Sequence, residues 1–176
     1  MRIPKQPDQN ETAIAHWEAV EEATELLLEE RYVDALFELR NVLKKDPTNA
    51  YAYHHSAVAM FETGRLEAAR DAYRAALRFS PDYLGARVGL SHTLRRLGDV
   101  EGALKEAREA LRRFPKDGDA MHAAGLAHAA LGNRRLAKDH LEEYLDSSPE
   151  LEAQYEVRQI LEMLGLADND EPIHFE

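Results

Sequence analysis

The sequence predicts an all-α protein built as a stack of helical hairpins, and three observations carry that prediction. The chain repeats its layout, because four prolines stand 34 residues apart: Pro47, Pro81, Pro115 and Pro149. The same interval links other columns: Ala35, Ala69, Ala103 and Ala137; Leu43, Leu77, Leu111 and Leu145; and Gly64, Gly98 and Gly132, with Glu30 at the matching site of the first copy. Within each copy, apolar residues recur every three or four residues, as on one face of a helix. A fixed interval held by several columns indicates an array of similar units.

Each unit is predicted to be a pair of helices, as the second copy illustrates. Between residues 50 and 62, Tyr53, Ala57 and Met60 recur at helical spacing. Gly64 then closes that helix, because glycine adopts the left-handed conformation of a helix terminus. A second helix follows over residues 66–79. Pro81 ends the unit, since proline does not continue a helix but suits the start of the next one.

The elements are expected in the following order. Residues 1–11 hold two prolines and polar side chains and are predicted to be an extended or disordered arm. Thr12 is the expected cap of a first helix that continues to about Leu28. The remaining hairpin helices are predicted at 32–45, 50–62, 66–79, 83–96, 100–113, 119–130 and 134–147. We expect a capping helix at about 152–165, with an inner set of Val157, Ile160, Leu161 and Leu164, and then an acidic, mobile tail over 166–176 in which Ile173 and Phe175 are candidates for docking.

The repeat resembles the tetratricopeptide repeat family over residues 16–151. The resemblance rests on alanine at the twentieth position, leucine at the twenty-eighth, proline at the thirty-second, and small residues at the eighth: Ala23, Ala57, Ser91 and Gly125. It implies a right-handed α-solenoid domain over 12–165, with repeats at 16–49, 50–83, 84–117 and 118–151. Two departures stand out, because only Tyr53 keeps the large aromatic of the fourth position, and Tyr144 replaces a small residue in the last copy. A large residue there fits a terminal repeat that meets a cap.

Composition limits the classes of function. The chain has no cysteine, so disulfides and thiolate metal sites are excluded. Its start lacks the apolar run of a signal peptide and no stretch reaches the length of a membrane span, so we expect a cytoplasmic protein without a membrane partner, unless a leader was removed. The net charge is −5 over residues 1–49, +3 over 50–117 and −9 over 118–176.

The resemblance implies that the first helices of the hairpins line a concave face. The residues it places there include an unusual share of apolar and histidine side chains: Trp17, Tyr51, His54, His55, Val58, Phe61, Val88, His92, Arg95, Arg96 and His122. Exposed aromatic side chains with polar neighbours are typical of a site for a peptide or helix of another protein. We therefore predict an adaptor that binds such a segment in this groove. The alternative occupant is the protein's own arm, its tail or a neighbouring copy.

Other site chemistries find little support in the residues. Some family members grip a carboxylate with lysine and asparagine at these positions, and neither residue occurs here, although Arg95 and Arg96 are able to pair a ligand carboxylate. Histidines on neighbouring first helices lack the HExxH spacing of a zinc site, and His128 is assigned to the interior. No nucleophile motif or phosphate loop is present. The sequence thus predicts no enzyme activity, no cofactor and no metal.

The second helices carry a ladder of basic residues on the opposite, convex face: Arg40, Lys44, Arg74, Arg78, Arg108 and Arg112. Such a stripe suits nucleic acid or an acidic partner. The acidic composition, the nearby acids and the lack of interleaved aromatics favour a solvated surface instead. Two further alternatives remain open. One is a homo-oligomeric scaffold in which the acidic ends meet the basic middle, and the other is a secretion-type chaperone.

Overall fold

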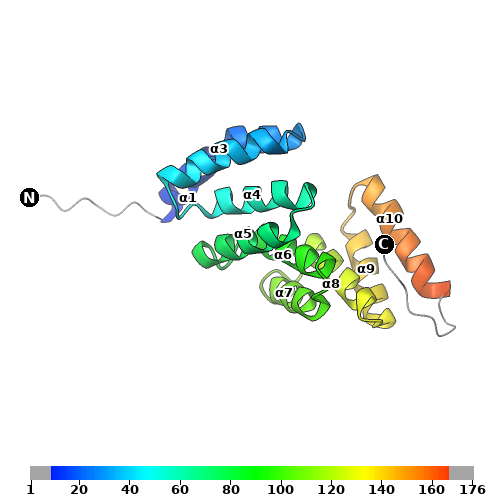
Figure 1. Cartoon of the computed structure of the whole chain (residues 1–176). Helices are drawn as coiled ribbons and strands as arrows, with labels where there is room; N and C mark the ends of the chain where they lie inside the picture. Colours follow the sequence, from blue (N-terminus) through cyan, green and yellow to red (C-terminus); the bar gives the residue numbers. More distant parts are fainter. Residues whose placement is uncertain (1–8, 167–176) are drawn as a thin grey trace, which may run out of the picture. The chain divides into compact units, whose positions relative to one another are not determined.

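The computed structural model describes residues 9–166, which form an all-α helical repeat solenoid (Figure 1). The helices of this part of the chain are α1 Gln9–Glu18, α2 Glu21–Leu28, α3 Tyr32–Lys45, α4 Ala50–Glu62, α5 Leu66–Phe79, α6 Leu84–Arg96, α7 Val100–Arg113, α8 Gly118–Ala130, α9 Arg134–Asp146 and α10 Leu151–Leu166. They group into two compact units, the first ending at Ala86 and the second beginning at Arg87. Most of the predicted arm and acidic tail lies outside the described residues, including Ile173 and Phe175.

Consecutive helices pair as the repeat predicts. In the first unit α2 packs on α3 and α4 packs on α5, and in the second unit α8 packs on α9 (Figure 1). The predicted bounds of α3, α4, α5 and α7 are the observed ones, and α6, α8 and α9 differ by one residue at one end. The all-α prediction is confirmed. None of the helices within residues 9–166 combines the length and apolar character needed to cross a bilayer.

The alanine column has a direct structural cause. All four members are fully buried, with an exposed fraction of 0%: Ala35, Ala69, Ala103 and Ala137. They lie where the two helices of a hairpin approach each other, so a larger side chain there would force the axes apart. In the third repeat the hydroxyl of buried Ser91 donates to the carbonyl of Ala103, 2.8 Å away. The small residue at the eighth position therefore contacts the alanine column across the hairpin.

The glycine column closes the first helix of each hairpin. Gly64, Gly98 and Gly132 have φ values of 74°, 85° and 74°, and Glu30, at the matching site of the first repeat, has φ 57°. A side chain in this left-handed region costs roughly 1–2 kcal/mol. The first hairpin therefore holds a strained turn where the other three have relaxed ones.

Replacing that residue is expected to stabilise the protein. Glu30→Gly should raise the free energy of unfolding by about 0.5–1 kcal/mol, because glycine accepts the positive φ without steric cost. The measurement is a urea unfolding curve followed by circular dichroism. Glu25→Gly, inside α2, is the matched control and should destabilise by about 1 kcal/mol. A loss of stability in both variants would contradict the strain at Glu30.

The N-terminal helical region differs from the prediction. Thr12 does not cap the first helix, because α1 already begins at Gln9, and the expected single helix to Leu28 is broken between α1 and α2. At the break the amide of Val20 donates to the carbonyl of Trp17, a tighter turn than an α-helix makes. Val20 is fully buried in a core cluster that includes Leu39 and Ala52. Burying this side chain against the next repeat explains the change of direction.

The last helix caps the second unit, as predicted. Val157 and Leu164 on α10 are buried in one cluster with Leu141 and Tyr144 of α9. Ile160 and Leu161 pack against the same cluster and are partly buried. The large Tyr144 thus fills the space between the last hairpin and its cap, where a continuing array would need a small residue.

Candidate functional site

A buried asparagine fixes α1 beside the start of α4 in the first unit. Asn49 is 1% exposed, and its side-chain oxygen accepts from the Ala52 amide at 3.0 Å, which caps α4. Its Nδ2 donates to the carbonyl of His16 at 2.9 Å. The His16 Nε2 in turn lies 2.6 Å from an oxygen of Asp46. These contacts place Trp17, the next residue of α1, against the first turns of α4.

Aromatic rings from the first two repeats meet there, and we call them the first-unit cluster: Trp17, Tyr51, His54, His55, Tyr73 and Tyr83. The ring centroids of Trp17 and Tyr51 are 5.6 Å apart in an edge-to-face arrangement. Tyr51 meets Tyr83 in the same way at 5.2 Å, and His54 lies 4.7 Å from Tyr83. Edge-to-face contacts of this kind add stability beyond simple burial. The cluster is therefore a rigid, preformed surface element.

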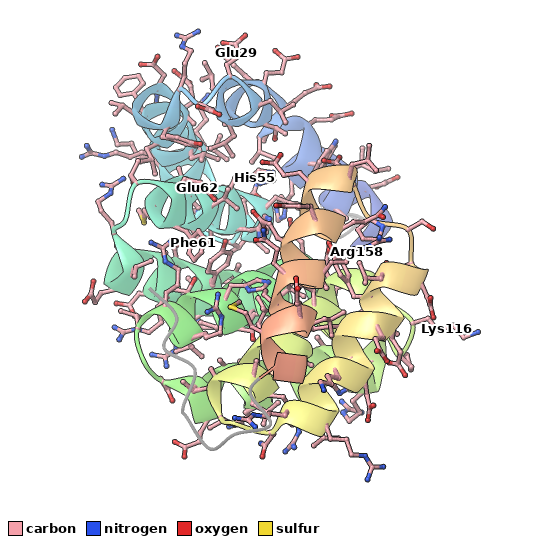
Figure 2. The ribbon with its side chains drawn as sticks, turned by 90° about the vertical axis from the view of Figure 1, so that its right-hand side faces the viewer. Glu29, His55, Phe61, Glu62, Lys116 and Arg158 are labelled. Atoms are coloured by element: carbon pink, nitrogen blue, oxygen red, sulfur yellow. The ribbon has the colours of Figure 1, made fainter. Side chains whose placement is uncertain are left out.

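The cluster is less open to water than the sequence predicts. His55 is only 7% exposed, because Trp17 of α1 and His54 pack on it and its Nδ1 lies 2.7 Å from the carbonyl of Tyr51. Figure 2 labels His55 in the middle of α4 and Phe61 and Glu62 at its C-terminal end. The expectation that His55 faces water is wrong, and the cause is the separate helix α1. Trp17 itself remains 47% exposed.

Burial keeps the histidines of this cluster neutral. It lowers the pKa of His54 to about 3, with the neighbouring His55 as the second cause. Burial also lowers the pKa of His55. Neutral imidazole rings next to tyrosines present an aromatic surface without positive charge at neutral pH.

A pocket opens next to the first-unit cluster. Its volume is about 510 Å³, within the range of ligand-binding pockets. Tyr51 and Tyr83 belong to both the cluster and the pocket wall. The full lining is Thr12, Ala13, His16, Thr48, Ala50, Tyr51, Phe79, Ser80, Pro81, Asp82 and Tyr83.

The second unit holds a smaller cluster of rings, the second-unit cluster, made of His92, His122 and Tyr144. The His92 and His122 centroids are 5.6 Å apart, and His122 stacks on Tyr144 at 4.7 Å. Burial, followed by the charges of His122 and Arg95, lowers the pKa of His92 to about 3. Burial and the charge of Arg95 lower the pKa of His122 to about 4. Arg95 therefore lies close to two neutral rings.

The other predicted groove residues vary in exposure. Val58 and Phe61 are half-buried on α4, and Arg96 is exposed. Val88 is 8% exposed, so the expectation that it faces water is wrong. The sequence missed Tyr83 as a member of the site, because it stands in the turn after a proline rather than on a helix face. Its only signal was an aromatic side chain where the turns before α4 and α8 have none.

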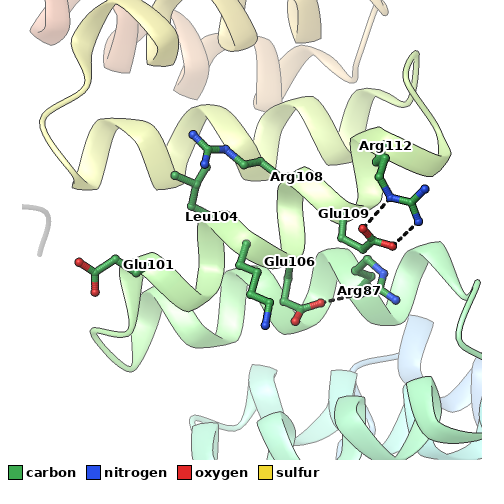
Figure 3. A pocket seen from close by; sticks show the side chains of 8 residues that line it. Arg87, Glu101, Leu104, Glu106, Arg108, Glu109 and Arg112 are labelled. Atoms are coloured by element: carbon green, nitrogen blue, oxygen red, sulfur yellow. Dashed lines mark hydrogen bonds and ion pairs between the residues drawn. The ribbon is translucent and has the colours of Figure 1, made fainter.

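The basic ladder is fully on the surface, since all six of its members are exposed. Part of its charge is neutralised locally. In the second unit Arg112 makes a bidentate contact with Glu109 at 2.8 and 2.7 Å, which lowers the pKa of that carboxyl (Figure 3). Arg112 and Glu109 line a second pocket, in the second unit, and Arg87 contacts Glu106 at 2.7 Å on its wall (Figure 3). Acids interleaved with the arginines favour a solvated surface over a site for nucleic acid.

The histidines do not gather into a metal site in the part of the chain that the structure describes, where no three potential ligand side chains converge. His128 is 2% exposed, with its Nδ1 3.4 Å from the Asn133 amide and its ring stacked on His140. It is an interior histidine, as predicted.

Two family models match the chain, and both matches end at a repeat boundary. Residues 26–83 and 88–151 each match a family model described as tetratricopeptide repeat. No curated protein sequence matches the chain.

Solved structures with a similar fold are numerous. A thermophilic tetratricopeptide repeat (TPR) protein from Thermus thermophilus shares 26% identity with a TM-score of 0.71, covering 86% of this chain and 82% of that one. MamA from Desulfovibrio magneticus RS-1 shares 16% identity with a TM-score of 0.72, covering 88% and 84%. The first TPR of Spaghetti (RPAP3), bound to the HSP90 peptide SRMEEVD, shares 22% identity with a TM-score of 0.58, covering 66% and 93%.

Proposed function

The chain belongs to the tetratricopeptide repeat family, and from this we propose that it is a non-catalytic interaction module that binds a segment of another protein. The binding surface is formed by the first helices of the hairpins within each unit. The first-unit cluster is the observation that carries the proposal, because it combines preformed aromatic rings, a half-exposed tryptophan and an adjoining pocket. Rigid aromatic side chains contribute much of the binding energy of protein interfaces.

The occupant is expected to be a peptide or helix with at least one large apolar side chain. The pocket of about 510 Å³ beside Tyr51 and Tyr83 has room for such a side chain. His54 and His55 of the adjoining first-unit cluster are neutral and so add no positive charge that would favour a carboxylate. The bound HSP90 peptide in the Spaghetti structure supports a peptide ligand for the fold.

Peptides selected from a displayed random library on the full chain provide the test. Tyr51→Ala and Phe61→Ala should each weaken the selected peptides about tenfold or more, as expected for anchor positions in an interface. Fluorescence anisotropy of labelled peptides measures the affinity, and a melting curve of each variant confirms folding. Phe37→Ala is the matched control, because Phe37 is 63% exposed on α3, a second helix of a hairpin.

Two results would contradict the proposal. Equal affinity of the Tyr51→Ala, Phe61→Ala and Phe37→Ala variants would place the peptide elsewhere. Light scattering of the purified chain that shows salt-sensitive particles and no selected peptide would favour the self-assembly alternative, for which the charge segregation along the sequence is the supporting observation.

A further inference from the structure

One arginine of the second unit has no counterion among the described residues. Arg95 lies near the C-terminal end of α6, half-buried, and its Nε is buried without a hydrogen-bond partner. No described residue forms an ion pair or hydrogen bond with its guanidinium. Buried charged groups in proteins are almost always paired, since removing an unpaired charge from water is costly. An unpaired guanidinium on a candidate binding face therefore needs a separate explanation.

The surroundings of Arg95 do not provide that partner. His92 lies three residues earlier on α6, and His122 lies on α8. Burial and the charge of Arg95 lower the pKa of both histidines, so both are neutral at neutral pH. Arg96, the next residue, adds a second positive charge and lowers the pKa of Arg95 together with burial. Arg95 thus has one further cation and two neutral rings beside it, while the acid Asp119 of α8 acts on Tyr144 and not on Arg95.

This arrangement complements a carboxylate. A guanidinium offers several N–H donors in a planar fork, and a carboxylate accepts two of them at once. The ring of His122, which lies near Arg95, stacks on the ring of Tyr144 with their centroids 4.7 Å apart, and this pair offers a flat surface for the stem of an acidic side chain. One half-buried guanidinium matches the single negative charge of a carboxylate. A phosphate dianion carries about two charges and three strong acceptors, so it matches this site less well.

We propose that Arg95, flanked by His92 and His122, binds the carboxylate of an Asp or Glu side chain in a partner segment. The inference rests on the proposed function and adds the chemistry of its ligand, namely an acidic residue seated in the second unit. It differs from the first-unit cluster, which takes an apolar group. The residue type differs from the lysine and asparagine that some family members use on this face.

A minimal probe tests the proposal without the natural partner. The blocked dipeptide N-acetyl-Leu-Glu-amide is titrated into the full chain carrying ¹⁵N-labelled arginine, and the Nε–H resonance of Arg95 is followed by NMR. We expect a saturable shift for this probe. The isosteric N-acetyl-Leu-Gln-amide should bind roughly ten- to a hundredfold more weakly, because it lacks the charge-assisted hydrogen bonds.

Two variants act as controls. Arg95→Met keeps the length of the side chain and removes the charge, so it should lose the preference for Glu over Gln, whereas Arg96→Met should keep most of it. Arg95→Met should also melt at the same or a higher temperature, since an unpaired half-buried charge does not stabilise the free protein.

Three outcomes would overturn the proposal. Equal shifts with the Glu and Gln probes, or no shift with either, would show that Arg95 does not select a carboxylate. Tighter binding of inorganic phosphate than of the Glu probe would assign the site to a phosphate. A fall in melting temperature of about 4 °C or more in Arg95→Met would show that the guanidinium already has a partner within the chain. None of these outcomes decides the peptide selection described above, because that test depends on Tyr51 and Phe61.

Discussion

Mild acidification is expected to destabilise the protein well before its carboxylates are protonated. Burial holds the pKa of His54 and His92 at about 3 and that of His122 at about 4, whereas a histidine in an unfolded chain has a pKa of about 6.5. Below pH 6.5 these histidines bind protons in the unfolded state but stay unprotonated in the folded state. The stability that depends on keeping these histidines neutral is therefore fully present above pH 6.5 and is lost as the pH falls toward 4.

The size of the effect follows from proton linkage. Each histidine that takes up a proton only on unfolding lowers the free energy of unfolding by about 1.4 kcal/mol per pH unit, so three together give about 4 kcal/mol per unit near pH 5. Urea midpoints measured by circular dichroism between pH 7.5 and 4.5 check this, since the first value lies above and the second below the usual histidine range. His54→Gln and His122→Gln should each reduce the slope by about one proton. A constant midpoint from pH 7 to 5 would contradict the buried neutral histidines.

Truncating the core of the last hairpin is expected to have the largest effect of any single substitution considered. Leu141 is 0% exposed and contacts the capping helix through the cluster with Tyr144, Val157 and Leu164. Leu141→Ala should lower the free energy of unfolding by about 3–4 kcal/mol, because it removes a buried side chain and leaves a cavity. Leu136→Ala, on the same helix but 43% exposed, should cost less than about 1 kcal/mol.

A second substitution makes this prediction sharper. A Cβ added at Gly125 would lie 2.7 Å from the Cγ and Cδ2 of Leu141, so Gly125→Ala alone should destabilise the fold by overpacking. Once Leu141 is alanine that clash is gone, and the higher helix propensity of alanine, worth about 1 kcal/mol, should appear as stabilisation. Urea unfolding of the two single variants and the double variant measures the change of sign. The same sign in both backgrounds would show that the two positions do not share one space.

Much of the fold was predictable because its causes are local. The buried Ala69 and the positive φ of Gly64 reflect demands that every hairpin makes, so they recur at a fixed interval in the sequence. The break near Val20 was not predictable in this way. It depends on the contact of Val20 with Leu39 and Ala52, which the repeat pattern does not encode for the first copy.

The sequence predicted which residues meet at the candidate site better than it predicted how buried they are. Trp17, Tyr51, His54 and His55 do come together, as their positions imply. The burial of His55 was not foreseen, because α1 is an extra helix outside the repeat pattern and covers one end of the face. The missing counterion of Arg95 is likewise a property of three-dimensional neighbours, which a linear pattern of charges does not reveal.

The attachment of α1 has a practical consequence for following this molecule in experiments. Trp17 is the only tryptophan of the chain and lies against Tyr51 and His55, where Asn49 holds α1 in place. Its indole emission therefore reports on α1 leaving the first unit, and the second unit contributes no tryptophan emission. Intrinsic fluorescence and far-ultraviolet ellipticity together distinguish detachment of the N-terminal helix from melting of the helices as a whole.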